Sequence, residues 1–147
     1  MFEPSNILIN GKEYNKSDDK QISVFSPSFQ YGLNIFEGIR GYFIESNIKC
    51  LAINQHLKRL INGANLIGME VDDEFLNTTK SDLNKLIKIG NQEKDIYIKY
   101  MLCYISEGNW AKTSKPDRVC FSYPLESNVK GKNTCKNVSA DFTSFRR

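Results

Sequence analysis

Two stretches in the middle of the chain have apolar residues at spacings of three and four, which predicts amphipathic helices at 54–68 and 72–90. Asn54 is placed to cap the first helix, and Gly68 is placed to end it. The second helix opens on two aspartates, which suit the positive end of a helix dipole, and it ends at Gly90. Each helix carries one apolar face, so we expect both to pack on a sheet.

Short runs rich in aromatic and β-branched residues predict the strands of that sheet. They lie at residues 6–9, 38–44, 49–53, 95–106, 118–123 and 138–145. Residues 45–47 join the second run to the third, and so short a connection predicts an antiparallel hairpin. Strands, then two helices, then more strands is an α+β order. We therefore predict an α+β fold, a mainly antiparallel sheet with two flanking helices.

Length and composition narrow the possible functions. A chain of 147 residues with 40% hydrophobic content suits one small core, and its net charge of +3 is spread without a basic block, which argues against nucleic-acid partners. The four cysteines form no close pair and there is one histidine, so no metal site is expected. The N-terminus is polar and no apolar run has membrane-spanning length, which favours a cytoplasmic protein without a membrane partner.

The segment FSPSFQYGLNIFEGIRGYF, residues 25–43, mixes aromatics, glycines and charges without a steady period. Gly32 and Gly38 allow a close backbone approach or a positive φ, and the aromatics are able to wall an apolar pocket. Those aromatics are Phe25, Phe29, Tyr31, Phe36 and Tyr42. The alternative is a buried turn with ordinary aromatic packing, and composition alone leaves both interpretations open.

Arg59 lies at the border of the apolar stripe of the first predicted helix, two residues after Leu57 and one before Leu60. From that position its guanidinium group is able to leave the helix surface and grip a phosphate with two parallel hydrogen bonds. Taken alone, an arginine at such a border is usually a solvated charge.

Several strings of the chain together resemble the class IV, fold-type IV pyridoxal-phosphate enzymes, and within them the branched-chain amino acid aminotransferases. The strings are YGLNIFEGIRGY at 31–42, HLKRL at 56–60, NGANLIGM at 62–69 and, more weakly, YIK at 97–99. The resemblance implies three parts of the chain. They are a small N-terminal domain at 1–123, an interdomain linker at 124–136, and the first strand of a truncated larger domain at 137–147, where TSFRR is similar to the family.

The resemblance also implies an activity: transamination of Leu, Ile and Val with 2-oxoglutarate or glutamate, in biosynthesis of branched-chain amino acids. The implied cofactor is pyridoxal 5'-phosphate, held through its phosphate by Arg59. The implied substrate-binding residues are Tyr31, Phe36, Gly38, Tyr97 and Lys99. In the family the residue matching Tyr31 reaches into the neighbouring subunit, which implies a homodimer or a higher homo-oligomer.

Two features depart from the family pattern. Lys99 stands where branched-chain enzymes have the arginine that helps to receive the side-chain carboxylate of glutamate, and lysine lacks the planar fork of that arginine. The Schiff-base lysine of the family follows the segment that TSFRR resembles, so no catalytic residue is expected in this chain. We expect the chain alone to be an inactive fragment. The alternatives are a class IV transaminase or lyase acting on another amine, and a non-catalytic orphaned domain.

Four further residues have two interpretations each. His56 is expected to be a packing or capping residue at the start of its helix, in preference to a general base. Glu37 and Arg40 flank a turn predicted at Gly38 and either pair to hold it or contact a ligand. Trp110 lies in the loop 107–116, where it either shields the site or has no function.

Overall fold

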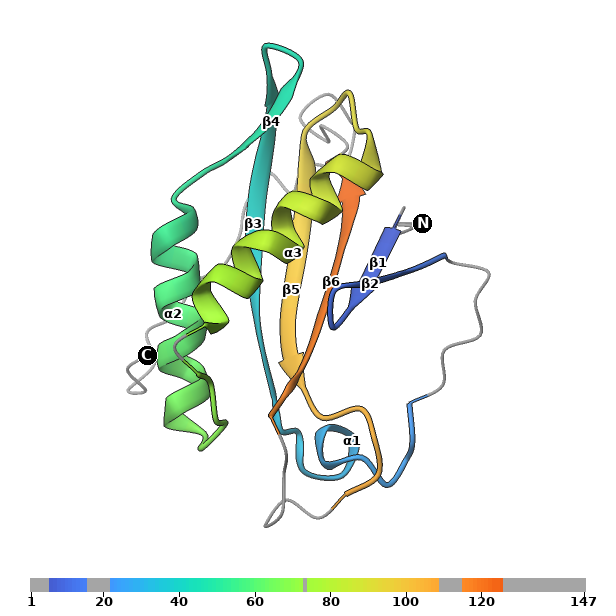
Figure 1. Ribbon diagram of the computed structural model, residues 1–147, viewed down its shortest axis with the longest axis vertical. Coiled ribbons are helices and arrows are strands. Elements are labelled where there is room, and N and C mark those ends of the chain that lie inside the picture. Colours follow the sequence, from blue (N-terminus) through green and yellow to red (C-terminus); the bar gives the residue numbers. More distant parts are fainter. Residues whose placement is uncertain (1–5, 16–21, 73, 109–114, 126–147) are drawn as a thin grey trace, which may run out of the picture.

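The computed structural model describes residues 6–15, 22–72, 74–108 and 115–125. In this part of the chain six antiparallel strands form one sheet in the order β2-β1-β6-β5-β3-β4, accompanied by three helices (Figure 1). The elements are β1 Asn6–Ile9, β2 Lys12–Tyr14, α1 Pro27–Tyr31, β3 Asn34–Ile44, β4 Asn47–Cys50, α2 Ile53–Leu66, α3 Phe75–Gly90, β5 Ile96–Cys103 and β6 Asp117–Pro124. The predicted α+β class and its mainly antiparallel sheet are confirmed.

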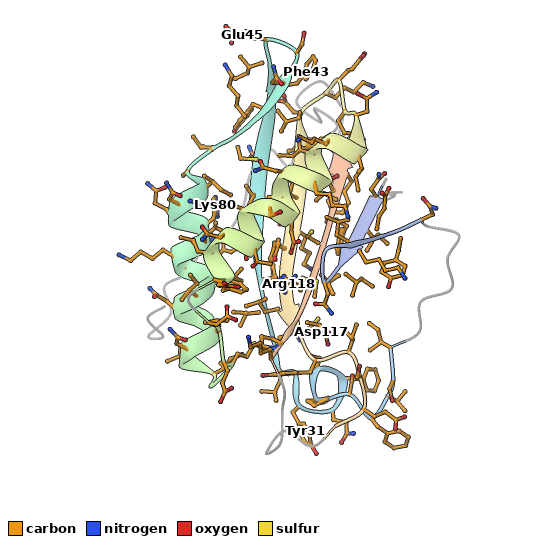
Figure 2. All side chains as sticks on the ribbon, in the orientation of Figure 1. Tyr31, Phe43, Glu45, Lys80, Asp117 and Arg118 are labelled. Atoms are coloured by element: carbon orange, nitrogen blue, oxygen red, sulfur yellow. The ribbon has the colours of Figure 1, made fainter. Side chains whose placement is uncertain are left out.

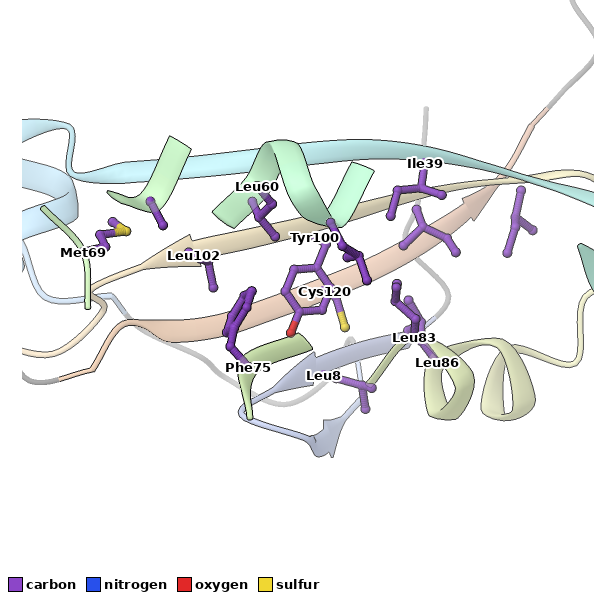
Figure 3. Close-up of a cluster of buried hydrophobic side chains, with 14 of the residues drawn as sticks. Leu8, Ile39, Leu60, Met69, Phe75, Leu83, Leu86, Tyr100, Leu102 and Cys120 are labelled. Atoms are coloured by element: carbon purple, nitrogen blue, oxygen red, sulfur yellow. The ribbon is translucent and has the colours of Figure 1, made fainter. Parts of the chain in front are cut away.

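Helices α2 and α3 both cover one face of the sheet. Figure 1 shows α3 running across the sheet over β5 and β6, and α2 lying beside β3. The side chains between them form a single core, in which Leu83 and Leu86 of α3 face Tyr100 and Cys120 of the strands (Figure 3). Successive residues of a strand point to opposite faces, so the residues that alternate with this core lie on the other face. No described helix covers that second face.

The predicted hairpin between β3 and β4 is confirmed, with Glu45 at its tip (Figure 2). Glu45 and Ser46 have φ of 52° and 59°, the left-handed values that a tight two-residue hairpin turn requires. Strand β3 is longer than the sequence predicts, because it begins at Asn34 and not at residue 38. The extra residues pair with β5, so β5 rather than β4 determines the length of β3.

The two predicted helices exist, but their starts differ from expectation. The cap of α2 is Ala52 in a left-handed conformation without a side-chain hydrogen bond, so the cap predicted at Asn54 is wrong. Gly68 ends this segment with φ of 73°, as expected. The other helix, α3, begins at Phe75 and not at Asp72, whose carboxylate lies outside the helix and pairs with Lys115 at 2.6 Å.

Helix α1 was not predicted, although the signals for it are in the sequence. Ser26 accepts a hydrogen bond from the N–H of Phe29, and Gly32 ends the helix with φ of 66°. The hydroxyl of Ser28 accepts from the N–H of Tyr104 at 2.6 Å and donates to the carbonyl of Leu33 at 2.6 Å. These bonds fix α1 to the ends of β3 and β5, at one end of the sheet.

A buried ionic group ties α3 to the sheet. The Asp82 side chain is 7% exposed, and its Oδ2 accepts from the Tyr100 hydroxyl at 2.9 Å and from Arg118 Nε at 2.9 Å. Burial raises the pKa of Tyr100, so the hydroxyl remains a donor at neutral pH. Figure 2 shows Arg118 on β6, one residue after Asp117.

Some predictions fall on parts of the chain outside the described residues. These are the strand at 138–145, the linker at 124–136 apart from its first two residues, the larger-domain segment at 137–147, and Trp110.

Candidate functional site

Part of strand β3 has no neighbouring strand on one side. Strand β4 pairs only with residues 41–44 of β3, while β5 pairs with residues 34–41 on the opposite side. The carbonyl of Arg40 points to the β4 side, where it accepts from the N–H of Leu51 at 3.2 Å. Because peptide groups alternate along a strand, those of Phe36 and Gly38 also point to this free edge.

A cavity of about 360 Å3 lies between this free edge and α2. Its lining residues come from the start of β3 and from the middle of α2: Asn34, Ile35, Phe36, Glu37, Gly38, Arg59, Leu60 and Gly63. The volume falls within the range of roughly 300–1,000 Å3 that small-molecule sites have. Among the described residues, Arg59 is the one cation of this lining, and none of the described lysines belongs to it.

Glu37 is a buried carboxylate that binds two residues of α2. Its side chain is 4% exposed, and it accepts from Arg59 through two parallel hydrogen bonds, Nε to Oε1 and Nη2 to Oε2, each 2.5 Å long. His56 Nδ1 lies 2.8 Å from Oε2. His56 and Arg59 are three residues apart, so one face of α2 presents both to the same carboxylate.

These contacts correct two expectations. Glu37 pairs with Arg59 and His56 and not with Arg40, and Gly38 lies within strand β3 and not in a turn. Burial raises the pKa of Glu37, but the hydrogen bonds from Arg59 and His56 outweigh it, and the pKa lies below its usual 4.5. The carboxylate is therefore charged at neutral pH, and the bonds to it raise the pKa of Arg59.

Arg59 uses only one side of its guanidinium group for Glu37. The bonds come from Nε and Nη2, and no described residue bonds Nη1. The side chain is 62% exposed, so the outer edge formed by Nη1 and Nη2 faces solvent at the cavity. This edge is a two-pronged donor of the kind that binds phosphate or carboxylate.

The uncovered face of the sheet carries four of the expected substrate-binding residues. Lys99 lies directly opposite Gly38 in the β3–β5 register, and its Nζ is 4.3 Å from the centroid of the Phe36 ring. Tyr97 stacks on Tyr123 with ring centroids 5.5 Å apart. A side chain at Gly38 would overlap the Tyr97 ring, since a Cβ there would lie 2.7 Å from Cζ. Gly38 is thus required by a neighbouring side chain.

Other expected aromatics are not part of this arrangement. Tyr31 is the last residue of α1 and is 58% exposed, at the end of the molecule away from the β3–β4 hairpin (Figure 2). Neither Tyr31 nor Phe25, Phe29 or Tyr42 lines the cavity, so of the five aromatics expected to wall a pocket only Phe36 does.

The role of Glu37 as partner of Arg59 was missed by sequence reasoning, although a signal was present. Glu37 lies in phase with Ile35 and Ile39 along the strand, so alternation places it on the core face. A carboxylate in that position needs donors, and the His56 and Arg59 spacing supplies two from one helix face.

The residues present fit a phosphate monoester at the cavity. The outer edge of Arg59 supplies a permanent cation with two parallel donors, and the cavity continues along the apolar wall of Ile35, Phe36 and Leu60. Within the described residues no group of His, Cys, Asp or Glu is arranged to hold a metal ion. None of the described helices is long and apolar enough to cross a membrane.

The fold is that of the N-terminal part of the branched-chain aminotransferases. The T.th. enzyme, solved with pyridoxamine 5'-phosphate, superposes with a TM-score of 0.76 at 19% identity, over 90% of this chain and 44% of that one. The Escherichia coli enzyme gives 0.72 at 21% identity, over 84% and 42% of the two chains. The Thermoproteus uzoniensis enzyme, solved with norvaline, gives the same four values.

Two curated relatives that are similar in sequence are also named as branched-chain-amino-acid aminotransferases. A probable branched-chain-amino-acid aminotransferase of Aquifex aeolicus is 33% identical over 87 residues, which are 56% of this chain and 27% of the relative. The branched-chain-amino-acid aminotransferase of Pseudomonas aeruginosa is 26% identical over 99 residues, 65% of this chain and 31% of the relative. The chain thus spans less than a third of the curated relatives it matches. No family model matches it.

Proposed function

We propose that this chain forms the small, cofactor-phosphate side of a cytoplasmic pyridoxal-phosphate aminotransferase that exchanges amino groups between branched-chain amino acids and 2-oxoglutarate. The observation that carries the proposal is Arg59, which Glu37 holds at the cavity while no described residue bonds its Nη1. A phosphate monoester dianion requires such a fixed and permanently charged partner. The likeness to branched-chain aminotransferases in both sequence and fold supports this choice of cofactor.

The residues have distinct roles in this proposal. Arg59 binds the phosphate, and Phe36, Gly38 and Tyr97 form an apolar wall for the side chains of Leu, Ile and Val. Lys99 receives the side-chain carboxylate of glutamate. Its Nζ lies 4.3 Å from the centroid of the Phe36 ring, on the uncovered face of the sheet. The cofactor, when bound, supplies the electron sink of transamination.

Tyr31 acts in a neighbouring subunit, so the functional protein is a homodimer or a larger homo-oligomer. Its position at the exposed end of α1, apart from the cavity of its own chain, supports this role.

We further propose that the 147-residue chain supplies only part of an active site. No lysine of the part of the chain that the structure describes lines the cavity, and the chain spans less than a third of its curated relatives. We expect the purified chain to bind pyridoxal phosphate weakly and to catalyse no transamination. Incubation with the cofactor followed by borohydride reduction and mass spectrometry tests this. A stoichiometric adduct on one specific lysine would contradict it.

The activity itself is tested on the protein isolated from its own cells. Formation of glutamate from 2-oxoglutarate with Leu, Ile or Val, dependent on pyridoxal phosphate, is the expected result. Turnover only with other amines supports the second candidate, a class IV transaminase or lyase of different specificity, which Lys99 favours because it lacks the planar fork of arginine. Absence of turnover with every amine supports a non-catalytic domain.

A further inference from the structure

Glu37 determines which edge of Arg59 is available at the cavity. Its two oxygens accept from Nε and Nη2, so the side edge of the guanidinium group is occupied. His56 Nδ1 contacts Oε2 at 2.8 Å, which fixes the plane of the carboxylate. What remains for a ligand is the outer edge, Nη1 and the second N–H of Nη2, directed away from Glu37.

We propose that Glu37 is a positioning residue for phosphate binding: it clamps Arg59 by the side edge and thereby presents the outer edge to a phosphate group, which binds without displacing the clamp. The inference rests on the proposed function, because it assigns Glu37 a part in the same phosphate anchor. Glu37 itself need not touch the ligand.

The clamp has a physical purpose because Arg59 is otherwise free to move. Its side chain is 62% exposed, and a long exposed side chain loses rotamer entropy when a ligand immobilises it. Glu37 is 4% exposed and lies on the central part of a paired strand, so it is a rigid point of attachment. Holding Arg59 before the ligand arrives reduces the entropy lost on binding.

A competing interpretation predicts the opposite effect of Glu37 on phosphate binding. If Glu37 only neutralises Arg59, its negative charge repels an incoming phosphate, and removal of that charge should tighten phosphate binding. If Glu37 positions Arg59, its removal should weaken binding. Glu37→Gln separates the two, because the amide keeps the size of the side chain but replaces one acceptor oxygen with an NH2 group that faces donors of Arg59 or His56.

The test measures the Kd for inorganic phosphate of the 147-residue chain and of its Glu37→Gln variant by NMR titration. Titrations are made at ionic strengths of about 0.02 M and about 0.5 M, because charge repulsion is screened at the higher value while rotamer restriction is not. We expect the variant to bind about three- to tenfold more weakly. The difference should grow at the higher ionic strength. Tighter binding at low ionic strength and equal binding at high ionic strength would overturn the inference.

Asp82→Asn is the matched control. Asp82 is also a buried carboxylate paired with an arginine Nε, but it does not line the cavity. The Asp82→Asn substitution should lower the stability of the fold and leave the Kd for phosphate unchanged. An equal loss of affinity in this control would show that Glu37→Gln acts through general loosening of the fold, and would also overturn the inference.

The unmodified chain provides a second measurement if Glu37→Gln does not fold. The Nε–H proton of Arg59, bonded to Oε1, should exchange slowly with water and keep its signal when phosphate is added. Loss of that signal on phosphate binding would mean that Arg59 leaves Glu37 for the ligand, which contradicts the clamp. Failure of Arg59→Ala to weaken phosphate binding is a different outcome, since it refutes the proposed anchor itself.

Discussion

The ionic group that joins α3 to the sheet offers a sharp test of the fold. Oδ2 of Asp82 accepts from Tyr100 and from Arg118, each at 2.9 Å, beneath the core side chains of α3. Replacing Asp82 by Asn keeps the volume of the side chain but removes its charge and one acceptor. We expect Asp82→Asn to reduce the free energy of unfolding more than any change that removes only one of the two hydrogen bonds.

The expected size follows from burial. Breaking a fully buried ion pair from one side costs about 3–5 kcal/mol, since an unpaired charge remains. Arg118 is 24% exposed, so water partly replaces its partner and the lower limit, about 3 kcal/mol, is expected for Asp82→Asn. Tyr100→Phe removes one hydrogen bond and leaves the charge pair intact, so about 1.5 kcal/mol is expected. Against a total of roughly 5–15 kcal/mol both changes are measurable.

Urea denaturation followed by circular dichroism is the assay. A fall in the midpoint with unchanged slope reports a loss of stability and not a change in the denatured state. The reasoning fails if Asp82→Asn costs under about 1 kcal/mol, the range of an exposed pair. It also fails if Tyr100→Phe costs as much as Asp82→Asn, because the charge of Asp82 would then contribute nothing.

Three further predictions concern the sheet and the site. Gly38→Ala should cost about 1–3 kcal/mol in urea denaturation, because its methyl group overlaps the Tyr97 ring; Tyr97→Ala in the same chain should relieve most of this loss. The pKa of Glu37 is lowered on folding, so its stabilising contribution is complete above its unfolded pKa and is lost as the pH falls through the folded value. Below about pH 4.5 the urea midpoint of Glu37→Gln should therefore fall less steeply with falling pH than that of the unmodified chain. The same dependence on pH in both proteins would contradict the lowered pKa of Glu37. Burial raises the pKa of Cys103 and of Cys120 to about 12, so neither thiol should react with iodoacetamide at pH 8 until urea unfolds the chain; prompt labelling seen by mass spectrometry would contradict this.

The spacing of apolar residues was sufficient to predict the two long helices, because each helix buries one face on a single core. In α2 the buried residues Leu57, Leu60 and Ala64 follow the spacing of three and four from which the helix was predicted. The helix starts were wrong because they depend on backbone conformation, as at Ala52, whose φ of 51° no side-chain propensity indicates. Strand β2 was not predicted, because its three residues are too few to show a period.

The site was only partly predictable for a related reason. Arg59 drew attention by its place on the border of the helix stripe, and the resemblance to the class IV enzymes gave it the predicted role of phosphate anchor. Its partner Glu37 lies 22 residues earlier on a strand, and no local pattern connects the two. A pair with Arg40 was one of two interpretations suggested by nearness in sequence, but residues 37 and 40 point to opposite faces of β3, since only an even separation keeps two residues on one face.

The missing period of the segment from residue 25 to 43 now has a structural cause. From Asn34 onward it is a regular strand with the usual alternation, but both of its faces and one of its edges carry different chemistry. Phe36 and Gly38 belong to the uncovered face with Lys99, while Glu37 between them points to the core side and holds Arg59. A strand with one buried and one solvated face shows apolar and polar residues in turn. Here the core side holds a carboxylate and the open side an aromatic ring, so the usual contrast between the faces is inverted where the strand borders the cavity. Such an inversion costs stability unless the buried charge has donors, and the two donors from α2 are therefore the structural reason that this strand is able to form the wall of a site.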